Sequence, residues 1–122
     1  MTKEEKVNAF DPNGLASNSN LFGLPFNYAE SEVVVLPVPW EVTVSYSAGT
    51  ANAPEAIKKA SLQVDLYDSF LVDAWKRGII MLEVDKVLSS KSLENRKLSE
   101  TYLEQLETGN CDEKLLKKIN SI

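Results

Sequence analysis

One short apolar run constrains the fold of this chain more than any other feature of its sequence. Residues 33–36 are four consecutive aliphatic residues, which is typical of a strand covered on both faces, as in a parallel sheet. Pro37 and Pro39 follow and lack backbone N–H donors, so we expect regular pairing to end there. Residues 79–82 form a second fully apolar run and predict another buried strand. The two runs therefore predict an α/β fold in which they are neighbouring parallel strands joined by a right-handed crossover.

The segment between the two runs predicts a polar loop followed by a helix. Residues 43–52 are rich in Ser, Thr, Gly and Ala, and Pro54 suits the first turn of the helix that follows. This order places the loop at the carboxyl end of a strand, where α/β proteins bind ligands. Residues 62–67 alternate between apolar and polar side chains and predict a short edge strand. Residues 68–78 predict a short helix or packed loop that Gly78 ends.

The two flanks differ in character from this central unit, which spans residues 32–88. Residues 1–31 show no sustained periodicity and predict an irregular arm, which is either docked through its few apolar side chains or a partly disordered leader. Residues 89–122 are charged and helical, and Asp112 suits the start of a second helix there. Their apolar side chains at helical spacing are Leu98, Tyr102, Leu103 and Leu106. We expect 1–31, 32–88 and 89–122 to form one partial domain, because the short sheet covers too little apolar surface.

Composition and charge exclude several classes of function. The formal net charge is -5 and no cluster of Lys and Arg is interleaved with aromatic residues, so we expect no nucleic-acid partner. No apolar run approaches the roughly 18 residues that a membrane-spanning helix needs, so we expect a soluble, cytoplasmic chain without a membrane partner. Cys111 is the single cysteine and has no histidine to activate it, so we interpret it as an unreactive thiol.

The catalytic repertoire of the chain is narrow. It contains no histidine, which removes the commonest general base and the commonest metal ligand. Asp65 and Asp68 lie three positions apart, and we interpret them as turn caps rather than metal ligands. Glu83 and Asp85 follow the second apolar run, where α/β enzymes often place catalytic carboxylates, but a solvated strand end is the favoured interpretation. We therefore expect no catalytic residue and no metal site in this chain.

The loop and the helix after the first strand also carry a resemblance to a known family. The matching motifs are Ser-Tyr-Ser-Ala-Gly-Thr at residues 45–50 and Ala-Pro-Glu-Ala-Ile at residues 53–57, followed by Ala60 and Ser61. Over about a third of its length, the chain resembles the ureohydrolases, the arginase and agmatinase family. The chains of that family are much longer than this one. The resemblance therefore implies that this chain is the N-terminal part of a three-layer α/β/α arginase-like fold with a parallel sheet, incomplete in this chain.

The family's chemistry is the hydrolysis of a guanidino C–N bond, which releases urea and an amine. Water is activated between two manganese ions, which the resemblance implies for the full-length family. The metal-binding segments of the family, Gly-Gly-Asp-His, Asp-x-His-x-Asp and a late Asp-x-Asp, are absent from this sequence. We therefore expect the chain to bind no manganese and to be inactive alone. The implied partners are a small guanidino substrate and either further copies of the chain or the remainder of a ureohydrolase.

Four loop residues match the family beside the mouth of its active site, and the resemblance gives them a peripheral role in shaping the substrate entrance. They are Ser45, Tyr46, Gly49 and Thr50. Trp40 and Tyr46 have side chains that suit the lining of such an entrance, but packing beneath the loop as core is the favoured interpretation. An alternative of a different class is a stand-alone binding or assembly module that keeps the strand, loop and helix without catalysis.

Overall fold

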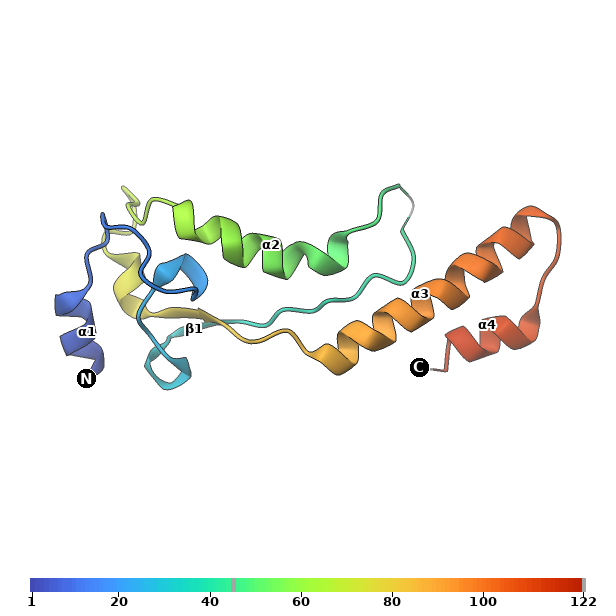
Figure 1. Cartoon of the computed structure of the whole chain (residues 1–122), viewed down its shortest axis with the longest axis horizontal. Coiled ribbons are helices and arrows are strands. Elements are labelled where there is room, and N and C mark those ends of the chain that lie inside the picture. Colours follow the sequence, from blue (N-terminus) through green and yellow to red (C-terminus); the bar gives the residue numbers. More distant parts are fainter. Residues whose placement is uncertain (45, 122) are drawn as a thin grey trace. The chain divides into compact units, whose positions relative to one another are not determined.

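The structure of the chain is a computed structural model that describes residues 1–44 and 46–121 (Figure 1). Its main elements are α1 (Lys3–Ala9), β1 (Val33–Val35), α2 (Ala53–Ala60), β2 (Ile79–Met81), α3 (Lys86–Glu107) and α4 (Glu113–Ile119). Short 3-10 helices lie between them: η1 (Leu21–Gly23), η2 (Tyr28–Glu30), η3 (Thr50–Asn52), η4 (Ser61–Gln63) and η5 (Ala74–Arg77). This mixture of helices with a small parallel sheet agrees with the α/β class. In the described part of the chain, no helix is both long and apolar enough to cross a membrane.

The contacts divide the chain into two compact units, each built from two separate segments. The first unit consists of Met1–Pro37 and Pro54–Glu83, and it contains the sheet and most of α2. The second consists of Val38–Ala53 and Val84–Ile122, and it contains the polar loop, α3 and α4. The polar loop that precedes α2 therefore belongs to the same unit as the C-terminal helices α3 and α4.

The two apolar runs pair as parallel strands, as the sequence predicts. The residues in register are Val33 with Ile79, Val34 with Ile80 and Val35 with Met81. The Leu82 N–H donates to the Val35 carbonyl at 3.0 Å and extends the pairing beyond the last of these pairs. The strand then ends where Pro37 removes a donor. The prediction of two neighbouring parallel strands and the prediction that the first of them ends before the prolines are both confirmed.

The expectation that the first strand is covered on both faces is wrong for this chain. Val33 and Val34 are 44% and 40% exposed, whereas Met81 at the end of β2 is buried. In the described sheet β1 has β2 as its only neighbour. An edge strand of a two-stranded sheet finds few side chains to pack against, which explains the exposure of the valines.

The predicted strand over residues 62–67 is also wrong. After α2 ends at Ala60, residues 61–63 continue as the 3-10 turn η4, and Ser61 is buried. The Ser61 hydroxyl donates to the Lys58 carbonyl at 2.7 Å and accepts the Phe22 N–H at 2.8 Å. These hydrogen bonds extend the helix end and join it to the N-terminal arm, and they override a weak alternating pattern.

The N-terminal arm packs against the rest of the first unit. Of the two interpretations, a docked arm and a partly disordered leader, the structure agrees with the docked arm. Leu24 and Phe26 from the arm and Trp75 from η5 form a buried cluster. The Phe10 and Trp75 rings add a contact with 5.0 Å between their centroids. Partly buried side chains around the cluster are Val7, Phe10, Phe22, Leu66 and Ile79. The arm therefore supplies much of the core of its own unit.

The arm is also less irregular than predicted, because residues 3–9 form α1. Thr2 and Glu5 make a capping box: the Glu5 N–H donates to Thr2 Oγ1 at 3.2 Å, and the Thr2 N–H donates to Glu5 Oε2 at 2.8 Å. The spacing that produces this cap is visible in the sequence. Apolar periodicity does not predict this helix, because its seven residues are too few to show a period.

The prediction of two C-terminal helices is confirmed, and each begins at an aspartate. Asp112 accepts the N–H groups of Lys114 and Leu115, both at 3.0 Å, as the sequence predicts. Asp85 caps α3 in the same way. α4 then turns back beside α3 (Figure 1).

The buried side of α3 is polar, which the apolar stripe did not predict. Ser92, Asn95 and Ser99 are buried, whereas Leu103 and Leu106 from the predicted stripe are exposed. The buried residues are spaced by three and four positions and so share one helical face. Small and polar side chains therefore make up the most buried face of α3.

Replacing Leu24 with alanine should test whether the docked arm contributes to stability. Leu24 is fully buried, so Leu24→Ala should lower the free energy of unfolding by about 2–5 kcal/mol. The matched control Leu15→Ala removes a fully exposed leucine of the same arm and should change it by less than about 0.5 kcal/mol. Urea unfolding followed by tryptophan fluorescence gives both values. Equal effects of the two substitutions would contradict the docked arm.

Candidate functional site

The structure separates the loop residues that the sequence assigns to a substrate entrance. Gly49 has a φ of 134°, which is open to glycine and costly for other residues, and Thr50 follows it as the first residue of η3. The Tyr46 side chain is fully exposed, so the interpretation that it packs beneath the loop is wrong, and Trp40 is only partly covered. Ser45 lies outside the described residues. The structure thus brings Gly49 and Thr50 into one turn and leaves Tyr46 facing solvent.

A carboxylate that the sequence analysis did not single out organises this turn. Glu41 Oε2 accepts the N–H of Gly49 at 2.8 Å and the N–H of Ala51 at 3.0 Å. The side chain of Glu41 is 5% exposed. The first N–H groups of a helical turn have no partner within the turn, and an ionised carboxylate is a strong acceptor for them. Glu41 therefore caps the start of η3 from outside the turn.

The same glutamate is bound to α3 through both its side chain and its backbone. Arg96 Nη1 donates to Glu41 Oε1, and the Glu41 N–H donates to Ser92 Oγ at 2.7 Å. Arg96 Nε also pairs with Glu100 Oε1 at 2.8 Å. The Arg96 side chain is largely buried, whereas that of Glu100 is about half exposed. Glu41 thus connects the loop to one face of α3.

These contacts favour the ionised form of Glu41. The N–H groups of Ala51 and Gly49 lower the pKa of its carboxyl below the ordinary value of 4.5, and the positive charge of Arg96 lowers it further. Burial acts in the opposite direction and is outweighed. A carboxylate that stays ionised and fully hydrogen-bonded holds structure in place and is a poor proton donor at neutral pH.

A cavity of about 380 Å³ lies beside this arrangement. The segment before α2 contributes Glu41, Ala48, Gly49, Ala51 and Asn52, and α3 contributes Ser89, Ser92, Leu93 and Arg96. All of these residues belong to the second unit. The cavity therefore combines loop backbone, two hydroxyls, one carboxamide, three apolar side chains and the Glu41–Arg96 ion pair.

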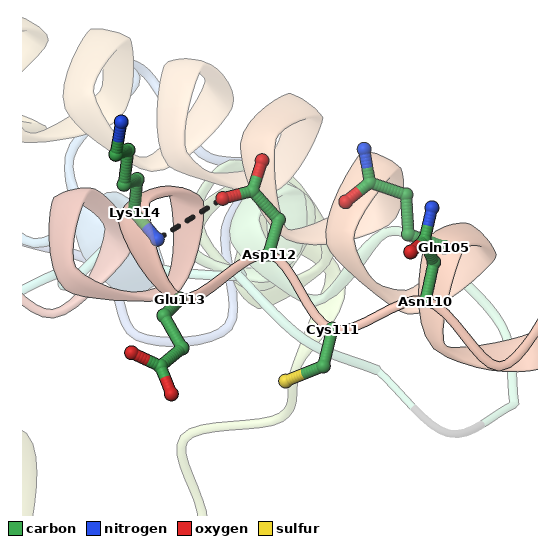
Figure 2. Close-up of a pocket in the computed structure, with 6 residues that line it drawn as sticks. All are labelled: Gln105, Asn110, Cys111, Asp112, Glu113 and Lys114. Carbon is green, nitrogen blue, oxygen red and sulfur yellow. Dashed lines mark hydrogen bonds between the residues drawn. The ribbon is translucent and has the colours of Figure 1, made fainter.

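A second hollow, of about 530 Å³, lies where α3 connects to α4. Figure 2 shows that the side chains lining it do not converge on a common point, and that Asp112 is engaged by the backbone of Lys114. Its lining residues are Gln105, Asn110, Cys111, Asp112, Glu113 and Lys114. Cys111 Sγ lies 3.6 Å from the Tyr102 hydroxyl, and this contact raises the pKa of Tyr102. The polar group in contact with the Cys111 thiol is therefore the Tyr102 phenol, which is not a base that could activate the thiol.

The other carboxylates considered from the sequence have structural or surface roles. Asp65 accepts the Tyr67 N–H at 2.9 Å, and Asp68 caps the next turn, so their interpretation as turn caps is confirmed. Glu83 is 91% exposed and pairs with Lys58, as a solvated strand end does. Asp85 is the cap of α3. Within residues 1–44 and 46–121, no group of three or more His, Cys, Asp or Glu residues is placed to hold a metal ion.

Comparison with known proteins gives a partial match to a ureohydrolase. Over 45 residues the chain is 47% identical to N(1)-aminopropylagmatine ureohydrolase from Synechocystis sp.. The matched stretch is 37% of this chain and 15% of that protein. No family model and no solved structure matches the chain. The chain is therefore similar to a ureohydrolase over part of its length.

The pH dependence of the loop should report the ionisation of Glu41. Because its folded-state pKa is lowered, its contribution to stability is present above pH 4.5 and is lost as the pH falls through the folded-state pKa. The NMR shifts of the Gly49 and Ala51 amides should therefore change with a midpoint below 4.5. In Glu41→Gln this transition should vanish from both amides. A midpoint at or above 4.5, or a transition that persists in Glu41→Gln, would contradict the assignment.

Proposed function

We propose that this chain is the N-terminal portion of a manganese-dependent ureohydrolase of the arginase and agmatinase type, with residues 43–52 beside the entrance to the active site. The observation that carries the proposal is the 47% identity over 45 residues to a ureohydrolase. The loop motif at residues 45–50 resembles the same family. The substrate is a small guanidino compound, and hydrolysis of its guanidino C–N bond yields urea and an amine.

The residues of this chain do not fit a manganese site. The sequence has no histidine, and the described residues contain no suitable group of His, Cys, Asp or Glu. Under the proposal, the metal ligands and the groups that activate water belong to the remainder of the ureohydrolase. The exposed valines of β1 and the exposed Leu36 give that remainder an apolar surface to cover.

The described lining of the cavity carries one negative and one positive charge, Glu41 and Arg96, and these two side chains pair with each other. Glu100 pairs with Arg96 from outside the lining and adds one negative charge nearby. A negative charge near an entrance attracts a guanidinium or an ammonium group. The loop residues Tyr46, Gly49 and Thr50 would then shape the approach of the substrate rather than act on the scissile bond.

A chimera tests the proposal directly. The 45 matched residues of this chain would replace their counterparts in the Synechocystis ureohydrolase. The transplanted segment is proposed to have the same role as the segment it replaces. The rate of manganese-dependent urea release should therefore stay within about tenfold of the rate of the parent protein. A tenfold decrease corresponds to a loss of about 1.4 kcal/mol in transition-state stabilisation. A colorimetric urea assay with N(1)-aminopropylagmatine gives the rate.

The control chimera carries the same 45 residues in scrambled order and should be inactive. Circular dichroism and manganese content establish whether each chimera folds and is loaded. A folded, manganese-loaded chimera without activity would contradict the proposal. It would favour the stand-alone binding or assembly module.

A further inference from the structure

The loop of residues 46–50 has no apolar anchor of its own. All five residues are exposed, including the aromatic ring of Tyr46. Gly49 also adopts a positive φ that the other residues of the loop would resist. A short exposed segment with small side chains gains little from burial, so its conformation must be fixed by hydrogen bonds.

We infer that Glu41 and Arg96 form a latch, in which Arg96 holds the Glu41 carboxylate where it fixes the backbone of residues 49–51 against α3. Without Arg96 the loop is released. The inference goes beyond the proposed function, because it concerns the conformation of this chain alone and holds whatever reaction the whole protein performs.

The latch has two attachment points on one face of α3. Ser92 and Arg96 lie four positions apart, which places them one above the other on the helix. Ser92 Oγ accepts the backbone N–H of Glu41, and Arg96 binds its carboxylate. The glutamate is therefore fixed at both ends, and its remaining oxygen is directed at the N–H groups of Gly49 and Ala51.

Burial makes Arg96 necessary to this arrangement. The Glu41 side chain is almost completely removed from solvent, and an ionised carboxylate in such a position needs a charged partner. If Arg96 is removed, the carboxylate recovers solvation most easily by turning outward. That movement breaks both of its hydrogen bonds to the loop.

Glu100 provides a matched comparison. It also pairs with Arg96, at 2.8 Å, but its side chain is about half exposed, and the hydrogen bonds that the described loop backbone receives at Gly49 and Ala51 come from Glu41. Exposed ion pairs contribute little to stability. Removing the charge of Glu100 should therefore leave the latch intact, although it takes one carboxylate from the same arginine.

Amide hydrogen exchange of the full chain, followed by NMR, tests the latch. In Arg96→Ala, exchange at Gly49 and Ala51 should accelerate by roughly tenfold to a hundredfold relative to exchange at amides in the middle of α3, because two charge-assisted hydrogen bonds are lost. In Glu100→Gln, the same ratio should change by less than about threefold. Unchanged exchange at Gly49 and Ala51 in Arg96→Ala, or equal acceleration in α3, would overturn the inference.

Chemical rescue separates a latch from a purely packing role of the arginine. Millimolar methylguanidinium chloride should restore protection of Gly49 and Ala51 in Arg96→Ala, because it replaces the planar donor group beside Glu41. Methylammonium chloride at the same concentration should restore much less. A folded Arg96→Ala chain without rescue would overturn the latch. If Arg96→Ala does not fold, Arg96→Lys is measured instead, because lysine keeps the charge but not the planar donor group. A measurable acceleration of amide exchange at Gly49 and Ala51, smaller than about tenfold, would support the latch. Unchanged exchange at both amides would overturn it.

Discussion

The parallel pairing of β1 and β2 is the constraint that fixes where the chain twice leaves the sheet of the first unit. Parallel strands end at the same edge of a sheet. The loop follows the end of β1, and the segment that becomes α3 follows the end of β2. Within the second unit, the Glu41–Arg96 pair joins these two segments across 55 positions of the sequence.

Much of the fold was predictable because its signals are local. The apolar runs, the prolines after the first run, Gly78 and the cap at Asp112 each act within a few residues. The errors arise where longer-range contacts decide. The predicted strand at 62–67 gave way to hydrogen bonds between Ser61 and the arm, and the first strand is exposed because its only described neighbour is β2.

The candidate site was predictable only in part. The polar loop and the conformational freedom of Gly49 follow from composition and from glycine's tolerance of positive φ. Glu41 and Arg96 gave no signal, because each resembles an ordinary surface charge until the fold buries them together. No spacing rule relates residues on a strand exit and on a distant helix.

The central claim is that Glu41 and Arg96 act as one unit in fixing the loop, and a double-mutant cycle measures this directly. The chain has two tryptophans, so a Trp75→Phe background leaves Trp40, in the second unit, as the fluorescence reporter of urea unfolding. The account predicts that Glu41→Ala with Arg96→Ala loses clearly less stability than the sum of the two single losses. Additive losses would show that the two residues act independently, and they would contradict the account.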